Sequence, residues 1–415
     1  MNKLKSILSH QFFDYGLTYM IIALSGIMYF YKNNDEYTIL GCMVSSLIFI
    51  VRKKKIDNFF YVIILLFAAI EYLQMTWYGI YSFKSLIGNL LKLTFVYLSV
   101  KIVYDRYIEL YIKIMVFSAI VSYFFYLLTY VPGTTNFIVK NICPIFKPLF
   151  PLPSTLRYSF SPNIIVYNYN YEHVFLFRNV GPFWESGAFG TYLNFALMFN
   201  MIREKNLFSR TNIIIIVAII STFSTACYLA MFFFVFSYYL TRKDVKYKVL
   251  YIMLAGTVSV YSFFSLSFMQ EKIEENIANS DETTKSRFGS AVADIKVFSM
   301  NPMLGIGRSF ENRERISRKL NVLPHRNNGV TGLLADYGIL IFIFYFASIY
   351  YSFKRYVRDH YQFSNIGMVT WVMFANIIIM GFAQRFFLFP FAYSLLFLHL
   401  INFKKKENEV GLNMS

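Results

Sequence analysis

Charged residues are scarce in this chain, and so are cysteine and histidine. Only 15% of the 415 residues are Asp, Glu, Lys or Arg, whereas a soluble globular domain has roughly 25%. The three cysteines are Cys42 and Cys227 in apolar runs and Cys143 in a polar stretch, and no disulfide framework or metal cluster follows from that arrangement. No metal or other cofactor is therefore expected.

Apolar residues dominate what is present. The chain is 57% hydrophobic and 20% aromatic, with a mean hydropathy of +0.46. Apolar runs of membrane-spanning length recur along it, and the pattern predicts an all-α polytopic membrane protein with about 12 transmembrane helices. The predicted spans lie near 15–31, 37–51, 59–75, 86–102, 109–131, 187–202, 211–223, 226–241, 247–268, 329–352, 365–383 and 386–402.

The distribution of basic residues predicts the orientation of these spans. With the N-terminus inside, the cytoplasmic segments hold 22 of the 40 Lys and Arg residues, and the short external loops hold three. This asymmetry obeys the positive-inside rule and places both termini in the cytoplasm. The net charge of +17 is thus mostly a consequence of topology, and a nucleic-acid partner is not expected.

Two long polar segments interrupt the spans, and both fall on the external side. The predicted organisation is: helices in 1–130, a first large loop in 131–186, helices in 187–268, a second large loop in 269–328, helices in 329–402 and a cytoplasmic tail in 403–415. Long loops are usually functional. The second loop carries ten Lys or Arg residues, which suits an anionic ligand.

Four polar residues in these loops are candidates for a site. Arg178 and Glu185 lie in FRNVGPFWESG, directly before a predicted span. Arg287 lies in the first turn of SRFGSAVADIKVFSM (286–300), whose apolar residues have the spacing of an amphipathic helix, and His325 precedes the next span. The alternative interpretation is an interfacial one, in which the arginines bind lipid phosphates or snorkel and the histidine caps a helix.

Ionisable residues also lie inside predicted spans, where such groups are functional candidates by default. Glu71 and Lys92 are two of them. They are either separate polar sites or partners of each other within the helix bundle. Asp336 lies about two turns inside the span at 329–352, where it serves a polar cavity or bonds to a neighbouring helix.

At these residues the chain resembles the O-antigen polymerase (Wzy) and O-antigen ligase superfamily. The second loop, SRFGSAVADIKVFSMNPMLGIG followed by LPHRNNGVTGLLADYGIL, is similar to the family's arginine before an amphipathic helix, Asn-Pro-x-x-Gly-x-Gly and His-Asn pair. Here Arg326 separates His325 from Asn327, which leaves open whether Asn327 or Asn328 matches. The first loop is similar to the family's Arg-x-x-Gly-x-Phe-x-Glu, although Ser186 stands where the family often has proline.

The resemblance implies a GT-C-like glycosyltransferase in the bacterial inner membrane, which uses undecaprenyl-diphosphate-linked oligosaccharides at the periplasmic face without a metal. Arg178 and Arg287 would bind the diphosphate, because guanidinium groups bind phosphate oxygens and stabilise developing charge. His325 would be the general base, with Glu185 as the rival. Further substrate-binding candidates are Gly181, Arg326, Asn327 and Asn328.

Three functions remain open at the level of the sequence. A polymerase joins a growing lipid-linked glycan to the next lipid-linked repeat unit, with membrane lipids and a chain-length regulator as further partners. A ligase transfers the finished glycan to the lipid A-core. A flippase for lipid-linked oligosaccharides is the alternative of another class, although it predicts two homologous halves without long external loops.

Overall fold

The protein is almost entirely helical. The computed structural model describes residues 11–31, 33–146, 149–150, 162–169, 177–242, 287–324, 326–360 and 365–403. Within these ranges the only sheet is a short antiparallel hairpin, in which β1 (Asn163–Ile164) pairs with β2 (Tyr167–Asn168). The prediction of an all-α fold is confirmed.

Five helical segments among the described residues are long and apolar enough to cross a membrane, judged by length and composition. They are α4 (Asn34–Val51), α5 (Asn58–Tyr78), the continuous segment Phe83–Leu128, α16 (Gly329–His360) and α17 (Ile366–Ala383). The continuous segment consists of α6 (Phe83–Val103) and α7 (Tyr107–Leu128), joined by the 3-10 turn η1 (Tyr104–Arg106). These helices make the chain a membrane protein.

Other helices occupy most of the remaining predicted spans. They are α2 (Gln11–Ala23), α3 (Met28–Tyr31), α9 (Ser186–Glu204), α10 (Arg210–Ser221), α11 (Thr225–Thr241), α18 (Pro390–Phe397) and the 3-10 turn η5 (Leu398–Leu400). The predicted span at 247–268 lies outside the described residues.

Two predicted spans differ in detail from the structure. The span at 15–31 is broken between α2 and α3, where Gly26 has a φ of +139° and lies against the ring of Trp184. The span at 386–402 becomes helical only at Pro390. Proline restricts the residue before it to extended backbone and suits the first turn of a helix, so α18 begins there.

The two predicted loops contain short helices in their described parts. The first contains α8 (Thr134–Phe137), a π-helical turn η2 (Ile138–Ile142) and a 3-10 turn η3 (Cys143–Ile145). The second contains α14 (Arg287–Met300) and α15 (Phe310–Leu320). The amphipathic helix predicted over 286–300 is therefore present, from Arg287 to Met300.

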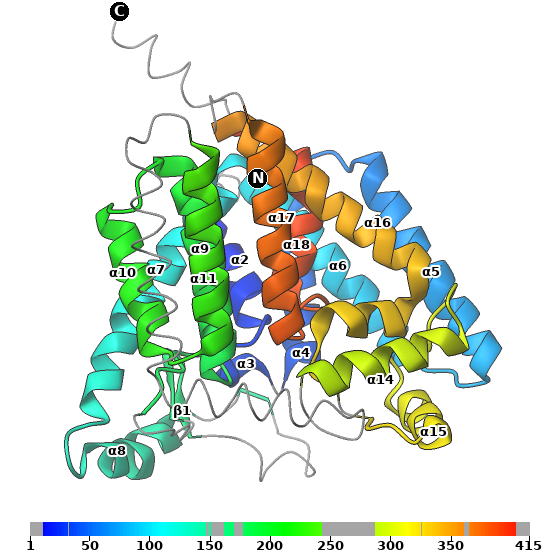
Figure 1. The fold of residues 1–415 in the computed structure, drawn as a ribbon, viewed down its shortest axis with the longest axis horizontal. Helices are drawn as coiled ribbons and strands as arrows, with labels where there is room; N and C mark the ends of the chain where they lie inside the picture. The colour runs from blue at the N-terminus through cyan, green and yellow to red at the C-terminus, as the bar shows by residue number, and fades with distance from the viewer. Residues whose placement is uncertain are drawn as a thin grey trace, which may run out of the picture.

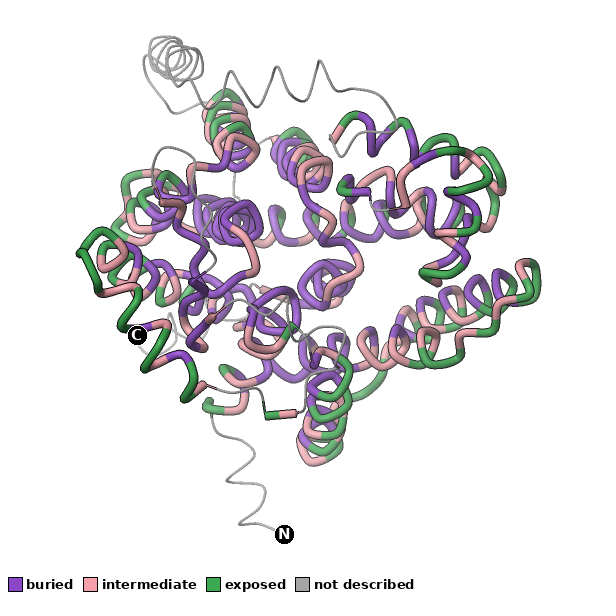
Figure 2. Tube along the Cα trace, turned by 90° about the horizontal axis from the view of Figure 1, so that it is seen from below, coloured by how far each residue is buried: buried purple, intermediate pink, exposed green. Residues whose placement is uncertain are grey.

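Helix α9 is the centre of the fold (Figure 1). It contacts α7, α10, α11 and α16, and its residues from Ser186 to Ile202 are all buried, as the purple tube segments show for the interior in Figure 2. Several of its polar side chains form hydrogen bonds inside the protein. The amide of Asn194, for example, donates to the carbonyls of Gly190 and Cys227 at 2.8 and 3.2 Å.

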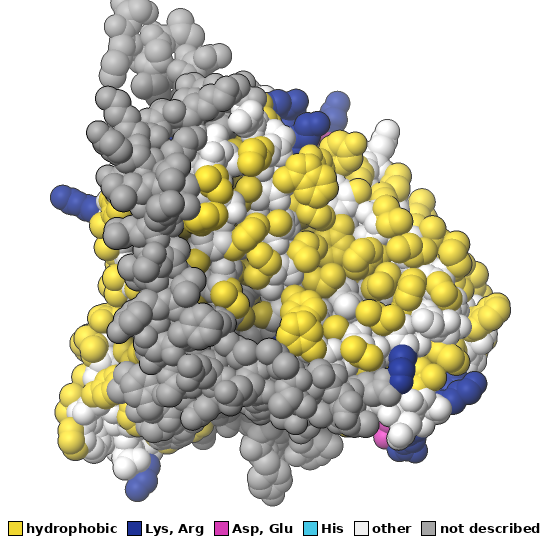
Figure 3. Space-filling view, viewed as in Figure 1, with side chains coloured by type: hydrophobic (Ala, Val, Ile, Leu, Met, Phe, Trp, Pro, Cys, Tyr) yellow, Lys and Arg dark blue, Asp and Glu magenta, His cyan; other side chains and the backbone are white. Residues whose placement is uncertain are grey.

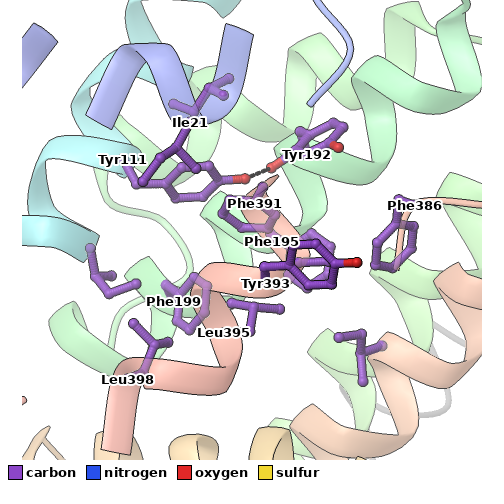
Figure 4. Close-up of a cluster of buried hydrophobic side chains, with 14 of the residues drawn as sticks. Ile21, Tyr111, Tyr192, Phe195, Phe199, Phe386, Phe391, Tyr393, Leu395 and Leu398 are labelled. Atoms are coloured by element: carbon purple, nitrogen blue, oxygen red, sulfur yellow. Dashed lines mark hydrogen bonds between the residues drawn. The ribbon is translucent and has the colours of Figure 1, made fainter. Parts of the chain in front are cut away.

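Aromatic side chains hold α9 against α7, α2 and α18 (Figure 4). The ring of Tyr111 stacks on Phe391 with 4.5 Å between centroids, and its hydroxyl donates to the carbonyl of Tyr192 at 2.7 Å. The hydroxyl of Tyr192 in turn donates to the carbonyl of Ser25 at 2.7 Å. Buried tyrosines thus pack as apolar rings while each hydroxyl finds a hydrogen-bond acceptor.

Helix α16 is kinked at Gly338, and the Gly-Ile-Gly turn of the second loop docks into the kink. Gly338 has a φ of +70° inside the helix, a conformation that glycine adopts without steric cost. Ile306 and Gly307 donate their backbone N–H groups to the carbonyls of Ala335 and Asp336, both at 2.9 Å. These bonds attach the second loop to a membrane-spanning helix.

Candidate functional site

The segment from Arg178 to Glu185 is anchored at both ends. At one end, Asn179 donates its backbone N–H to the carbonyl of Ser221 and its amide to the Ser221 hydroxyl, both at 2.9 Å. At the other end, Pro182 accepts from the backbone N–H of Met28 at 2.9 Å. The segment is therefore clamped between the end of α10 and the start of α3, and Glu185 follows as the residue that precedes α9.

Glu185 and Arg178 project from this clamped segment at the beginning of α9. Glu185 accepts a hydrogen bond of 2.6 Å from the side-chain amide of Gln384, which follows α17. Arg178 donates through Nε to the carbonyl of Thr222 in the turn between α10 and α11, at 3.1 Å. The thiol of Cys227 donates to the carbonyl of Gly187, two residues after Glu185, at 3.3 Å. Gly190 of α9 lies against both this thiol and the hydroxyl of Thr222, so the two side chains share one region.

Arg287 reaches the same region from the second loop. It is the first residue of α14, and its Nη1 donates to the carbonyl of Asn327 at 2.8 Å. Burial lowers the pKa of the Arg287 guanidinium, and the negative charge of Glu185 opposes that shift. Three predicted site residues from two distant loops, Arg178, Glu185 and Arg287, are thus brought together.

His325 lies outside the described residues, so its role as general base stays a prediction. The backbone of Asn327 is part of the region described above, since its carbonyl accepts from Arg287 and its N–H donates to the hydroxyl of Ser290 at 3.2 Å. Asn328 is buried and caps α16, because its side-chain oxygen accepts from the backbone N–H of Thr331 at 3.1 Å.

Arg326 is placed inside the protein. Its side chain is only 1% exposed and forms an ion pair of 2.5 Å with Asp294 of α14. It also donates to the hydroxyl of Ser317 at 3.0 Å and to the carbonyl of Leu323 at 3.1 Å. With these partners the guanidinium joins α14, α15 and the start of α16, which is a structural role.

Gly181 shapes the backbone rather than presenting a side chain. It has a φ of +52°, and a Cβ atom there would lie 2.8 Å from the ring of Phe189 in α9. Its N–H donates to the side-chain oxygen of Asn179 at 3.0 Å. This turn sets the direction in which the chain approaches Glu185.

Arg385 extends the region and was not among the predicted site residues. It follows Gln384 and pairs with Asp336, which also pairs with Arg313 of α15 at 2.8 Å. The side chain of Arg385 is 27% exposed. Asp336 is therefore the shared partner of two arginines. Of the two roles considered for it, a polar cavity or a bond to a neighbouring element, the structure shows bonds to neighbouring elements. The sequence signal for Arg385 was an arginine in a tight external turn.

A second polar cluster surrounds Glu71. Its carboxylate accepts from Asn89 at 2.7 Å and from the hydroxyl of Tyr337 at 2.6 Å, and it forms an ion pair of 3.8 Å with Arg308. Lys92 makes no ion pair with Glu71 in the described part of the chain. The expected alternative in which these two residues pair with each other is therefore not observed. Arg308 directly follows the Gly-Ile-Gly turn, and only the docking of that turn brings it to Glu71.

Within the described residues no three His, Cys, Asp or Glu side chains gather as a metal-binding group would. The described part of the site offers fixed charges: arginines beside the carboxylates of Glu185 and Asp336. Comparison of the chain with known protein families, with curated proteins and with solved structures returns no match.

Proposed function

We propose that the protein is a surface-polysaccharide polymerase of the O-antigen type. It transfers a growing glycan from undecaprenyl diphosphate to the next lipid-linked repeat unit at the periplasmic face of a bacterial inner membrane. The proposal includes about 12 spans with both termini in the cytoplasm. One observation supports it most: Arg178, Glu185 and Arg287, which the family resemblance selects from two separate loops, lie together at the beginning of α9.

The reaction breaks the bond between the anomeric carbon of the donor glycan and the diphosphate oxygen. An acceptor hydroxyl forms the new glycosidic bond and loses its proton to a base, and the diphosphate leaves with its electron pair. Negative charge grows on the leaving group, and fixed guanidinium groups stabilise it without rearranging. Arg178 and Arg287 supply such groups, with Arg385 as a third cation nearby.

The base is His325 or Glu185. Glu185 has the position for this role because it lies among the cations and accepts a hydrogen bond from Gln384. That bond orients the carboxylate, and orientation is a requirement for proton transfer from a bound hydroxyl. His325 is the other candidate because the family resemblance selects it.

The test is complementation of a strain that lacks the gene, with surface glycans separated on a gel. Arg178→Gln, Arg287→Gln and His325→Ala are compared with Arg318→Ala, a control whose side chain is 77% exposed. Losing one charge-assisted hydrogen bond to phosphate costs about 1.5–3 kcal/mol, so each arginine variant is expected to lose roughly 10-fold to 100-fold in rate.

The gel pattern, together with the side of the membrane on which lipid-linked units accumulate, distinguishes the three functions. A single repeat unit on the lipid core, in place of the ladder, supports a polymerase. Loss of all attached glycan identifies a ligase instead. Accumulation of lipid-linked units on the cytoplasmic side identifies a flippase. Full-length ladders from all three variants would refute the assigned site.

A further inference from the structure

The face of α14 that points away from the protein is apolar. Phe288, Val292 and Ile295 follow one another at helical spacing, and their side chains are 52%, 44% and 52% exposed. Helices in water place such residues inward and expose their polar face. In α14 these three large apolar residues lie on the exposed face, while Ala293, Val297 and the polar Asp294 are buried.

Hydrogen bonds fix this rotation. On the inward face, the carboxylate of Asp294 pairs with Arg326 at 2.5 Å and accepts from the hydroxyl of Thr331 at 2.8 Å. The hydroxyl of Ser290, one turn earlier, accepts from the backbone N–H of Asn327 at 3.2 Å. Turning the helix to bury its apolar row would leave these buried polar groups without partners. The hydrogen bonds therefore keep the apolar row exposed.

The contact between α14 and α17 shows at which level of the membrane the exposed face of α14 lies. The ring of Phe288 lies 5.2 Å from the ring of Phe382, next to the last residue of the membrane-spanning helix α17. Figure 1 shows α14 crossing beside the ends of α16 and α17 rather than running parallel to α17. The helix therefore begins at the level where the apolar length of α17 ends.

The apolar row of α14 continues a larger apolar surface. Trp371 and Met368 of α17 are exposed, and Figure 3 shows apolar side chains spread over this face of the molecule, with Lys and Arg at its upper and lower margins. Long basic side chains near the ends of membrane helices extend to the lipid interface, so the apolar surface between them is the part that contacts lipid. Lys296, exposed on the flank of α14, has the length to reach the headgroups from that depth.

We infer that α14 lies in the plane of the membrane surface, with Phe288, Val292 and Ile295 inserted among the lipid acyl chains. The occupant of this face is lipid because the face continues the lipid-contacting surface of α17. Within the second predicted loop, α14 is thus a membrane-surface element. This position holds Arg287, at the start of the helix, at the depth of lipid phosphates.

Spin labels on the full-length protein in lipid nanodiscs test this placement. The three native cysteines are replaced by alanine, and single cysteines are introduced as Val292→Cys and Ile295→Cys. Trp371→Cys is the reference in lipid, and Arg318→Cys is the reference in water. The labels at 292 and 295 are expected to relax with oxygen and to resist a water-soluble nickel chelate, as the label at 371 does.

Two outcomes would overturn the inference. Accessibility to the nickel chelate equal to that at 318 would place α14 in water. Protection from both reagents would show that a second copy of the chain or another protein covers the face. The outcome is independent of catalysis, because the labels report depth whether or not the protein is a polymerase. Unfolding curves of the labelled variants that match the cysteine-free parent confirm that the fold is kept.

Discussion

The side-chain amide of Gln384 donates a hydrogen bond of 2.6 Å to the carboxylate of Glu185, across 199 positions of the chain. The bond joins the residue that precedes α9 to the residue that follows α17. A carboxylate at the edge of a membrane is thereby held in one orientation. Arg385, the next residue after Gln384, brings a cation to the same place through its pair with Asp336.

The first prediction concerns the role of this pair. Glu185→Gln is expected to lower the rate of glycan transfer by about 100-fold or more, because a general base contributes on the order of 10² to 10⁴. Gln384→Met removes the orienting bond but keeps the carboxylate, and is expected to cost about 10-fold, close to one hydrogen bond. Initial rates with purified protein and lipid-linked repeat units measure both. A full rate for Glu185→Gln would exclude Glu185 as the base.

The second prediction concerns the buried pair of Asp294 and Arg326, whose side chains are each 1% exposed. Asp294→Ala leaves a buried guanidinium without its counter-charge and is expected to lower the free energy of unfolding by about 3–5 kcal/mol. The double variant Asp294→Leu with Arg326→Met is expected to regain most of that loss, since no charge is left unpaired. Equilibrium unfolding in detergent micelles measures both changes.

The control for this pair is Glu314→Ala, which removes the exposed pair with Arg318 and is expected to change the free energy of unfolding by less than about 1 kcal/mol. If Arg326 instead served the substrate, the stable double variant would lose activity. Full activity in the double variant agrees with the structural role of Arg326.

The third prediction separates backbone strain from steric overlap. Gly181 and Gly79 have φ values of +52° and +66°, but only at Gly181 would a Cβ atom meet another group, the ring of Phe189 at 2.8 Å. Both Gly→Ala variants are expected to lose about 1–2 kcal/mol for the left-handed conformation. Gly181→Ala is expected to lose a further 1–3 kcal/mol or so from overpacking. Equal losses in unfolding free energy would show that Phe189 moves aside.

The fourth prediction identifies the partner of Glu71. Arg308→Met is expected to destabilise the protein by about 3–5 kcal/mol, because it leaves the buried carboxylate without a cation, and to release the turn that docks into α16. Lys92→Met is the matched control, since it removes a nearby cation that makes no ion pair with Glu71 within the described chain. Thermal unfolding of the two variants compares them. A larger effect at Lys92 would contradict the observed pairing.

Local patterns were sufficient for most helices and for the class of protein. The predicted spans at 37–51 and 59–75 fall on α4 and α5 with similar bounds, because length and apolarity are properties of a continuous segment. The helix at Arg287–Met300 was predicted from spacing alone, yet its apolar row faces outward. Periodicity shows that a helix has two faces, but the Asp294–Arg326 pair decides which one turns inward.

The sequence by itself determined that this is a helical membrane protein and located Arg178, Glu185 and Arg287 in the two interrupting loops. Only the tertiary structure brought these three residues together. It also buried Arg326 in an ion pair with Asp294 and placed Gln384 within hydrogen-bond distance of Glu185. The physical reason is the range of the interactions. Hydropathy acts along a continuous segment, whereas these contacts join residues far apart in the chain, and the packing of the helices decides which residues meet.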